Sequence, residues 1–200
     1  MPALVPNPLP NAKEPESVLL LLDTQKYVLE DVKNGGIPAV EPIHKNIQQI
    51  LRIARASQTP ARIVHVRNSG NTGDPDEPDT NGWELIFPPL TNEFIIDKRK
   101  NNAFVGTNLG EVVPVNAELV VVGFQTDFSI RATCSTALAR GNEVLLVRGA
   151  HKTYPRIDVL HGGRITPAET VELEIEEELA EAGVHLFDME DVEHIFTESR

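Results

Sequence analysis

The sequence holds a single cysteine, Cys134, in 200 residues. One cysteine excludes an intramolecular disulfide and any zinc site built from several cysteines. Long hydrophobic runs are also missing: the run over residues 18–22 is far shorter than the roughly 18 residues that a membrane span needs. The first residues have no basic stretch followed by an apolar one, so they do not resemble a signal peptide. These features predict a cytoplasmic protein with no membrane partner.

Basic residues are few relative to acidic ones. The chain has 18 Lys and Arg against 30 Asp and Glu, which gives a net charge of −12. Nucleic-acid binding depends on Lys and Arg contacts to phosphate, so this charge argues against a nucleic-acid partner. Seven glutamates fall between residues 169 and 181. We expect them to form a solvated helix face rather than a partner site.

The remaining sequence divides into a proline-rich stretch and one domain. Residues 1–16 are predicted to form an extended arm, and residues 17–200 a single domain. Short apolar runs predict strands over residues 17–23, 61–66, 94–97, 117–124, 143–147 and 184–187. Helical spacing predicts helices over residues 43–56, 129–140 and 166–183, and a short one at the end. This alternation predicts an α/β protein, a doubly wound parallel sheet covered by helices on both faces.

Two local patterns refine this outline. Thr166, Pro167 and Glu169 suit the start of a helix, with Thr166 as its cap and Glu169 completing a capping box. Residues 68–82 contain no periodic pattern and are followed by Trp83, the only tryptophan. A loop of this length is often a lid or a binding loop.

Several polar residues follow the predicted strands directly. In doubly wound sheets, ligands bind outside the carboxyl ends of the strands. This rule selects Asp23, Asn68, Asp97 with Lys98, residues 125–129, and Ala150 with His151. An acid, a lysine and a hydroxyl would therefore meet at one edge, and these groups suit base-assisted nucleophilic attack.

Each of the three reactive groups also has a plain structural explanation. Asp23 is well placed to cap a helix, and so is Ser129. Lys98 lies in the charged run DKRK, which is typical of a solvated surface. From position alone, both interpretations stay open.

Four stretches resemble the motifs of one family, the isochorismatase-like cysteine hydrolases. They are LLLLDTQKYVLED, DKRKNNAFVGTNL, VVVGFQTDFSIRAT and GAHKTY, in the order of the family's motifs. The resemblance runs from about residue 17 to residue 188. Its register makes Lys98, rather than Lys100, the family lysine. Asn102 stands where the family usually has serine.

The resemblance implies a three-layer α/β/α fold around a six-stranded parallel sheet, and a triad of acid, lysine and cysteine. Asp23 and Lys98 take the first two places, and position 129 takes the third. It also implies a cis peptide bond between Phe124 and Gln125, and an oxyanion hole made by the N–H groups of Gln125 and Ser129. The implied substrate is a small amide or ureide, and no cofactor is implied. Relatives commonly form dimers or tetramers. The residues expected to line the substrate pocket are Gln25, Asn68, Trp83, Phe128 and His151.

The chain departs from the family because Ser129 occupies the cysteine position. Cys134 lies five residues later, about one and a half helical turns away, so it cannot substitute. We expect Cys134 to be a buried helix residue. Three explanations for Ser129 remain: an engineered Cys→Ser exchange, a natural serine variant or non-catalytic relative, or a reaction that needs no nucleophile. The ordinary motif around Ser129 favours the first.

Metal binding is not expected. The family's nicotinamidases carry Asp-x-His and a further His for zinc after the second strand, whereas this chain reads VHVRNSGNTG. We expect His65 to be a packed strand residue. The sequence therefore predicts a hydrolase of a non-peptide C–N bond whose activity Ser129 reduces or traps. The alternatives are a vinyl-ether hydrolase of the isochorismatase type and a non-catalytic, ligand-binding relative.

Overall fold

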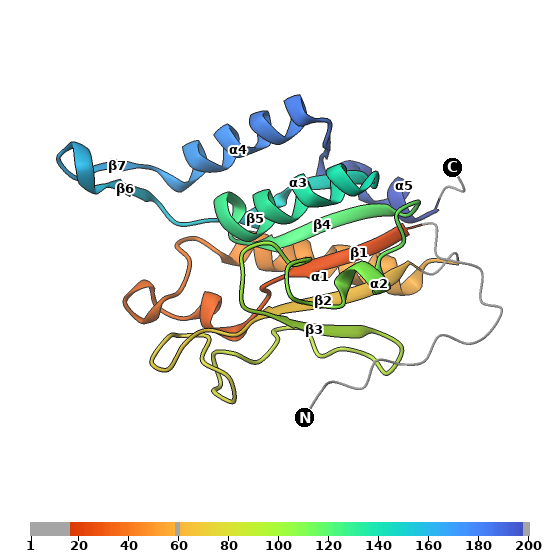
Figure 1. The fold of residues 1–200 in the computed structure, drawn as a ribbon, viewed down its shortest axis with the longest axis horizontal. Helices are drawn as coiled ribbons and strands as arrows, with labels where there is room; N and C mark the ends of the chain where they lie inside the picture. Colours follow the sequence, from red (N-terminus) through yellow and green to blue (C-terminus); the bar gives the residue numbers. More distant parts are fainter. Residues whose placement is uncertain (1–16, 59–60, 198–200) are drawn as a thin grey trace.

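The computed structural model describes residues 17–58 and 61–197; the predicted arm over residues 1–16 lies outside them. Its centre is a six-stranded sheet in the order β3-β2-β1-β4-β5-β8 (Figure 1). Every neighbouring pair in it is parallel. The predicted doubly wound α/β fold is therefore confirmed. The strands are β1 Ser17–Leu22, β2 Arg62–Asn68, β3 Phe94–Lys98, β4 Glu118–Phe124, β5 Glu143–Lys152 and β8 His185–Phe187.

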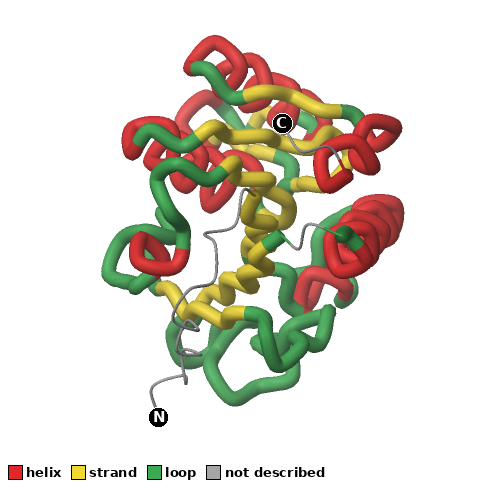
Figure 2. Tube along the Cα trace, turned by 90° about the vertical axis from the view of Figure 1, so that its right-hand side faces the viewer, coloured by secondary structure: helices red, strands yellow, loops and turns green. Residues whose placement is uncertain are grey.

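Helices cover both faces of this sheet (Figure 2). Successive side chains of β1 point to opposite faces, so Leu19 and Leu21 join one core and Leu20 and Leu22 the other. Burial on both faces explains why β1 is apolar throughout. The first core also contains side chains of α1 Glu41–Ala56 and α5 Val192–Thr197; the second contains those of α2 Leu109–Val112, α3 Arg131–Arg140 and α4 Ala168–Ala182.

Helix α4 does not begin as predicted. It starts at Ala168 with Pro167 as its N-cap, and no side chain caps it. The predicted capping box at Thr166 and Glu169 is wrong because Thr166 belongs to a β-hairpin instead. That hairpin pairs β6 Arg156–Asp158 with β7 Arg164–Thr166 and projects from the body (Figure 1).

Two other predicted elements have different bounds. The helix predicted over 129–140 is preceded by a turn of π-helix, Thr126–Ile130, which leads directly into α3. Strand β5 continues past Val147 to Lys152, so His151 lies within the strand rather than after it. Gly149, at φ 72°, lets the strand pass a register shift against β4.

The long segment between β2 and β3 runs beside the carboxyl ends of the strands (Figure 1). It forms a series of turns, and a single β-bridge joins it to another described segment, through Leu85 and Gln25. The predicted loop is confirmed. Single turns of 3₁₀-helix occur at Lys26–Leu29, Val32–Asn34, Val159–His161 and Met189–Asp191. Within residues 17–58 and 61–197, no helix is long and apolar enough to cross a membrane.

Candidate active site

Asp23 occupies the first position after β1, in a sharply bent backbone. Its φ is 52°, in the left-handed region that Asp tolerates better than most residues. Its N–H donates to the carbonyl of Val66, 2.9 Å away. The neighbouring strand comes very close here, because a Cβ on Gly123 would lie 2.0 Å from the carbonyl oxygen of Leu22. Glycine at position 123 therefore allows β4 to pack beside the turn that carries Asp23.

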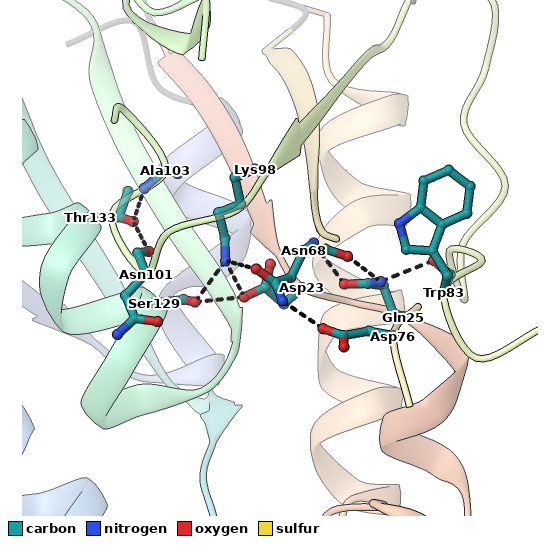
Figure 3. Close-up of polar contacts among 10 residues, drawn as sticks. All are labelled: Asp23, Gln25, Asn68, Asp76, Trp83, Lys98, Asn101, Ala103, Ser129 and Thr133. Atoms are coloured by element: carbon teal, nitrogen blue, oxygen red, sulfur yellow. Dashed lines mark hydrogen bonds and ion pairs between the residues drawn. The ribbon is translucent and has the colours of Figure 1, made fainter. Parts of the chain in front are cut away.

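Asp23, Lys98 and Ser129 meet at the carboxyl ends of β1, β3 and β4 (Figure 3). The Ser129 hydroxyl donates to Asp23 Oδ2 at 2.6 Å. The Lys98 ammonium lies 2.9 Å from the same oxygen and 3.1 Å from Ser129 Oγ. All three are at most 5% exposed. The sequence placed these groups at one sheet edge, and the structure brings them into direct contact.

Burial dominates the electrostatics of Asp23. It raises the pKa of the carboxyl, and it outweighs the opposing effects of the Lys98 charge and the Ser129 hydrogen bond. Within the described residues, Asp23 Oδ1 is buried and has no hydrogen-bond partner. The carboxyl group thus has one oxygen that binds the lysine and the hydroxyl, and one oxygen without a partner among the described residues.

The turn before Ser129 has the geometry that the family resemblance implied. The Phe124–Gln125 peptide bond is cis. The Gln125 carbonyl accepts from the N–H groups of Phe128 and Ile130, at 3.3 and 3.1 Å. These bonds hold Gln125 and Ser129 on one turn, at a helix start where N–H groups lack partners within the helix. Phe128, beside Ser129 in the chain, is 50% exposed.

Gln25 and Trp83 lie to one side of the cluster of Asp23, Lys98 and Ser129 (Figure 3). The Gln25 amide donates to the carbonyls of Asn68 and Trp83 at 2.9 and 3.0 Å, and accepts from the Asn68 N–H at 2.8 Å. The side chain is fully buried, so it fixes Asn68 and the loop rather than facing open space. The Arg67 guanidinium lies 3.3 Å from the centre of the Trp83 ring. The indole N–H donates to Ser69 Oγ at 3.2 Å.

His151 lies behind the π-helix. Its side chain is nearly fully buried. Nδ1 is 3.0 Å from Thr126 Oγ1, and Nε2 is 3.1 Å from Glu176 Oε1. Both ring nitrogens therefore face protein groups, and His151 lies between the π-helix and α4.

Two further contacts of the site were not found from the sequence. Asn68 donates from Nδ2 to Asp76 Oδ2 at 2.6 Å, and accepts from Lys98 Nζ at 3.2 Å. Asp76 lies in a run rich in acidic residues, DPDEPD, where no pattern separates it from its neighbours. The second contact joins two of the motifs, because Thr133 Oγ1 accepts from the N–H of Ala103 at 3.1 Å. It fixes the segment after Lys98 against α3.

Cys134 and His65 are buried, as expected. Cys134 is fully buried in α3, and burial raises the pKa of its thiol to about 12. His65 is also fully buried, with Nε2 2.8 Å from Glu93 Oε2. In the part of the chain that the structure describes, no three His, Cys, Asp or Glu side chains are grouped to hold a metal ion.

Comparison with known proteins gives the family. Residues 17–160 match the family model described as "Isochorismatase domain". The chain belongs to the isochorismatase family. The predicted recognition is confirmed at this level, and so is the expected class of enzyme, a hydrolase, at the level of the family.

Relatives within the isochorismatase family agree with this assignment. The chain is 33% identical over 158 residues to a streptothricin hydrolase of Streptomyces noursei. The match covers 77% of this chain and 61% of that protein. A second S. noursei streptothricin hydrolase is 33% identical over 138 residues, covering 65% of this chain and 50% of the relative. The chain thus spans between half and two thirds of the length of these relatives.

Solved structures share the fold along nearly the whole chain. A hydrolase of the isochorismatase family from Chromobacterium violaceum superposes with a TM-score of 0.80 at 25% identity, covering 96% of this chain and 98% of that one. An isochorismatase from Pseudomonas putida KT2440 gives a TM-score of 0.77 at 26% identity, covering 92% and 93%.

Proposed function

We propose that the chain hydrolyses a non-peptide C–N bond in a small amide or ureide. Asp23 is the proton acceptor, Lys98 its electrostatic partner, and residue 129 the nucleophile. One observation carries the proposal: a single buried oxygen, Asp23 Oδ2, holds both the Ser129 hydroxyl and the Lys98 ammonium. This arrangement takes a proton from a nucleophile and keeps the resulting charges paired.

The contacts support the following reaction. Ser129 Oγ attacks the carbonyl carbon while its proton passes to Asp23. The N–H groups of Gln125 and Ser129 donate to the resulting oxyanion, which would stabilise it by a few kcal/mol. Asp23 then returns the proton to the leaving nitrogen, and the C–N bond breaks. Asp23 then takes a proton from water, whose oxygen attacks the acyl carbon. As the C–Oγ bond breaks, Asp23 returns this proton to Ser129 Oγ, which releases the acid and restores the site.

Ser129 makes the first step slow. A free thiol has a pKa of about 8.5, whereas an alcohol is far less acidic. Asp23 and Lys98 therefore activate a hydroxyl less effectively than a thiol in the same place. We propose that position 129 belongs to a cysteine in active relatives, and that the serine reduces turnover or traps a bound substrate. The name of the S. noursei relatives makes a streptothricin the first compound to assay.

A second candidate is hydrolysis of a vinyl ether. Its support is the raised pKa of Asp23 together with Oδ1, which has no hydrogen-bond partner among the described residues, because this reaction needs the carboxyl as a proton donor. Here Asp23 protonates the substrate and Ser129 is not attacked or acylated. A non-catalytic relative would bind either type of substrate without turnover.

The experiment compares the parent chain with Ser129→Cys, Ser129→Ala and Asp23→Asn on primary amides, ureides, a streptothricin and isochorismate. Ser135→Cys introduces the same change at an exposed position of α3 and serves as the control. We expect Ser129→Cys to hydrolyse at least one amide or ureide about tenfold faster than the parent, or more, because a thiolate is the better nucleophile. Ser135→Cys should match the parent. An inert Ser129→Cys, combined with isochorismate hydrolysis that requires Asp23, would establish the second candidate instead.

We also propose that the chain self-associates through the β6–β7 hairpin. Four apolar side chains on or beside this hairpin are at least 60% exposed: Ile157, Val159, Leu160 and Ile165. The hairpin carries Arg164, while its Arg156 already pairs with Glu174 of α4 in the same chain at 3.0 Å. The other glutamates of α4 present an acidic outer face. The opposite charges favour a second copy of this chain as the partner.

A further inference from the structure

The Lys98 ammonium has three N–H donors, and the structure gives each one a partner. Two are the reacting groups, Asp23 Oδ2 and Ser129 Oγ. The third is the side-chain oxygen of Asn68, at 3.2 Å. Lys98 is 2% exposed, so water does not compete freely for these donors. The position of the Asn68 oxygen therefore helps to set where the positive charge lies.

Asn68 is held from two sides (Figure 3). Gln25 binds both its N–H and its carbonyl, which fixes the main chain. These backbone contacts do not fix the side chain, which the Asp76 carboxylate restrains by accepting from Nδ2 at 2.6 Å. If the amide turned over, its NH₂ would face the ammonium and its oxygen would face the carboxylate. Asp76 therefore selects the orientation that points oxygen at Lys98.

The loop between β2 and β3 is folded so that it presents Asp76 at this place. The Asp76 carbonyl accepts from the N–H of Gly70 at 3.0 Å. A Cβ on Gly70 would lie 2.1 Å from Asp76 Oδ1, so the carboxylate packs directly against the glycine backbone. Asp76 is 8% exposed, although it belongs to an irregular surface loop. The loop thus presents a buried acid to Asn68, which in turn contacts Lys98.

We propose that Asp76 is a positioning residue, which acts through Asn68 to fix the Lys98 ammonium between Asp23 and Ser129. The inference rests on the proposed function, because it assigns Lys98 a part in the reaction. It explains why a long loop without regular structure contains a buried acid. Correct folding of residues 70–76 becomes a condition for a competent site.

The negative charge of Asp76 also affects the pKa of Asp23. Burial is the main cause that raises the pKa of Asp23, and the negative charge of Asp76 adds to it. Removing that charge should therefore lower the pKa of Asp23. A side chain that only fills space would not produce this effect.

The first experiment needs no turnover. The Asp23 carboxyl carbon is titrated by NMR in the parent, in Asp76→Asn and in Asp79→Asn. Asp76→Asn keeps the shape of the side chain and removes its charge, while Asp79→Asn makes the same change at an exposed position of the same loop. We expect a lower pKa of Asp23 in Asp76→Asn and the parent value in Asp79→Asn. An unchanged Asp23 titration in Asp76→Asn would overturn the electrostatic link.

The second experiment is a double-mutant cycle, made in the parent chain or in Ser129→Cys, whichever hydrolyses an amide or ureide faster. Asp76→Ala should lower kcat on the order of 100-fold, as misplaced catalytic groups do, with KM nearly unchanged. Asn68→Ala should do the same. Because Asp76 acts through Asn68, the double variant should be no slower than Asn68→Ala alone. Losses that multiply in the double variant, or a loss confined to KM, would contradict the proposal.

The two proposals can fail separately. If neither the parent nor Ser129→Cys hydrolyses any compound, the proposed function fails. The NMR signal of the Lys98 ammonium then decides the positioning role. It should move in Asp76→Ala, and it should be the same in Asn68→Ala with or without that change. If the Lys98 signal keeps its position in Asp76→Ala, the inference is wrong. Circular dichroism shows whether each variant is folded.

Discussion

Asp23 combines two features at the scale of a single residue. One carboxylate oxygen is shared by a cation and a hydroxyl, and the other is buried without a hydrogen-bond partner in the described residues. The first oxygen suits a proton acceptor, and the second suits a proton donor. The protonation state of Asp23 therefore decides which of the two candidate reactions is possible at a given pH.

The pH dependence of the rate separates the two reactions. The pKa of Asp23 lies above its ordinary value of 3.8 because of burial. As an acceptor, Asp23 must be ionised, so kcat/KM for an amide should rise with pH through the raised pKa. As a donor it must be protonated, so kcat/KM for a vinyl ether should fall over the same range.

Substitution of this carboxyl tests the assignment. In Asp23→Asn, kcat should fall by about 10²- to 10⁴-fold, the usual contribution of a general acid or base. The measurement is the steady-state rate of the parent chain and of Asp23→Asn between pH 3 and pH 8. If Asp23→Asn keeps the same rise or fall of the rate with pH, another group causes it, and Asp23 does not take part in the reaction.

The residues of the proposed reaction could be selected from the sequence, but the residues that orient them could not. Asp23, Lys98 and Ser129 each follow an apolar run, and the ends of parallel strands meet at one edge. Asp76 and the clamp formed by Gln25 depend on how an irregular loop folds. No periodicity encodes that path, so nothing in the sequence distinguishes Asp76 from the acids beside it.

At the scale of elements, strand and helix identities were predicted more accurately than their ends. Arg148 and Gly149 interrupt the apolar pattern of β5, but backbone pairing with β4 continues past them to Lys152. Thr166 has the composition of a helix cap, but it pairs with Arg156 in the hairpin. In both cases, tertiary hydrogen bonds determine the boundary, and local composition does not report them.

A buried ionic contact joins α1, β2 and the end of the long loop that leads into β3. Glu93 accepts from Arg55 of α1 at 2.7 and 2.8 Å, and lies 2.8 Å from Nε2 of His65 in β2. Its Oε2 also accepts from the N–H of Leu90. Burial acts to raise the pKa of Glu93, but the hydrogen bonds from Arg55 and His65 outweigh it, and the pKa falls to about 2. Glu93 thus fixes the end of the long loop to the sheet and to α1.

Loss of this contact should be visible as a pH-dependent loss of stability. A lowered pKa in the folded chain means that Glu93 stabilises the fold above its ordinary pKa of 4.5, and that this contribution is lost as the pH falls towards 2. Glu93→Gln should therefore reduce the free energy of unfolding on the order of 3 kcal/mol at pH 6, and by less at pH 3. Urea unfolding at both pH values measures the difference. Glu181→Gln, on the exposed face of α4, is the control and should change little. A deficit that does not depend on pH would contradict this account of Glu93.

At the scale of the whole molecule, the segments of the proposed site and of the proposed interface lie at one end. The turn after β1, the long loop and the β6–β7 hairpin all lie at the carboxyl ends of the strands (Figure 1). The net charge of −12 keeps the remaining surface hydrated. The hairpin carries the two most exposed large apolar side chains of the described residues, Val159 and Leu160, at 84% and 90%.

Self-association should depend on these two side chains. The parent chain should form a dimer or tetramer, since burying the hairpin removes apolar surface from water. The double variant Val159→Ser, Leu160→Ser should shift it towards the monomer, as measured by size-exclusion chromatography with light scattering. Val115→Ser, which changes another exposed valine, should leave the assembly intact. A monomeric parent, or an oligomer that survives the double variant, would show that the hairpin is not the interface.

The central claim is that Asp23, Lys98 and residue 129 form one hydrolytic site. Its most direct test is the intact mass of Ser129→Cys, quenched in acid during turnover of an amide, followed by peptide mapping. The account predicts an acyl group on residue 129 that is absent in Ser129→Ala and depends on Asp23. Turnover without any adduct, or an adduct on Cys134, would contradict it.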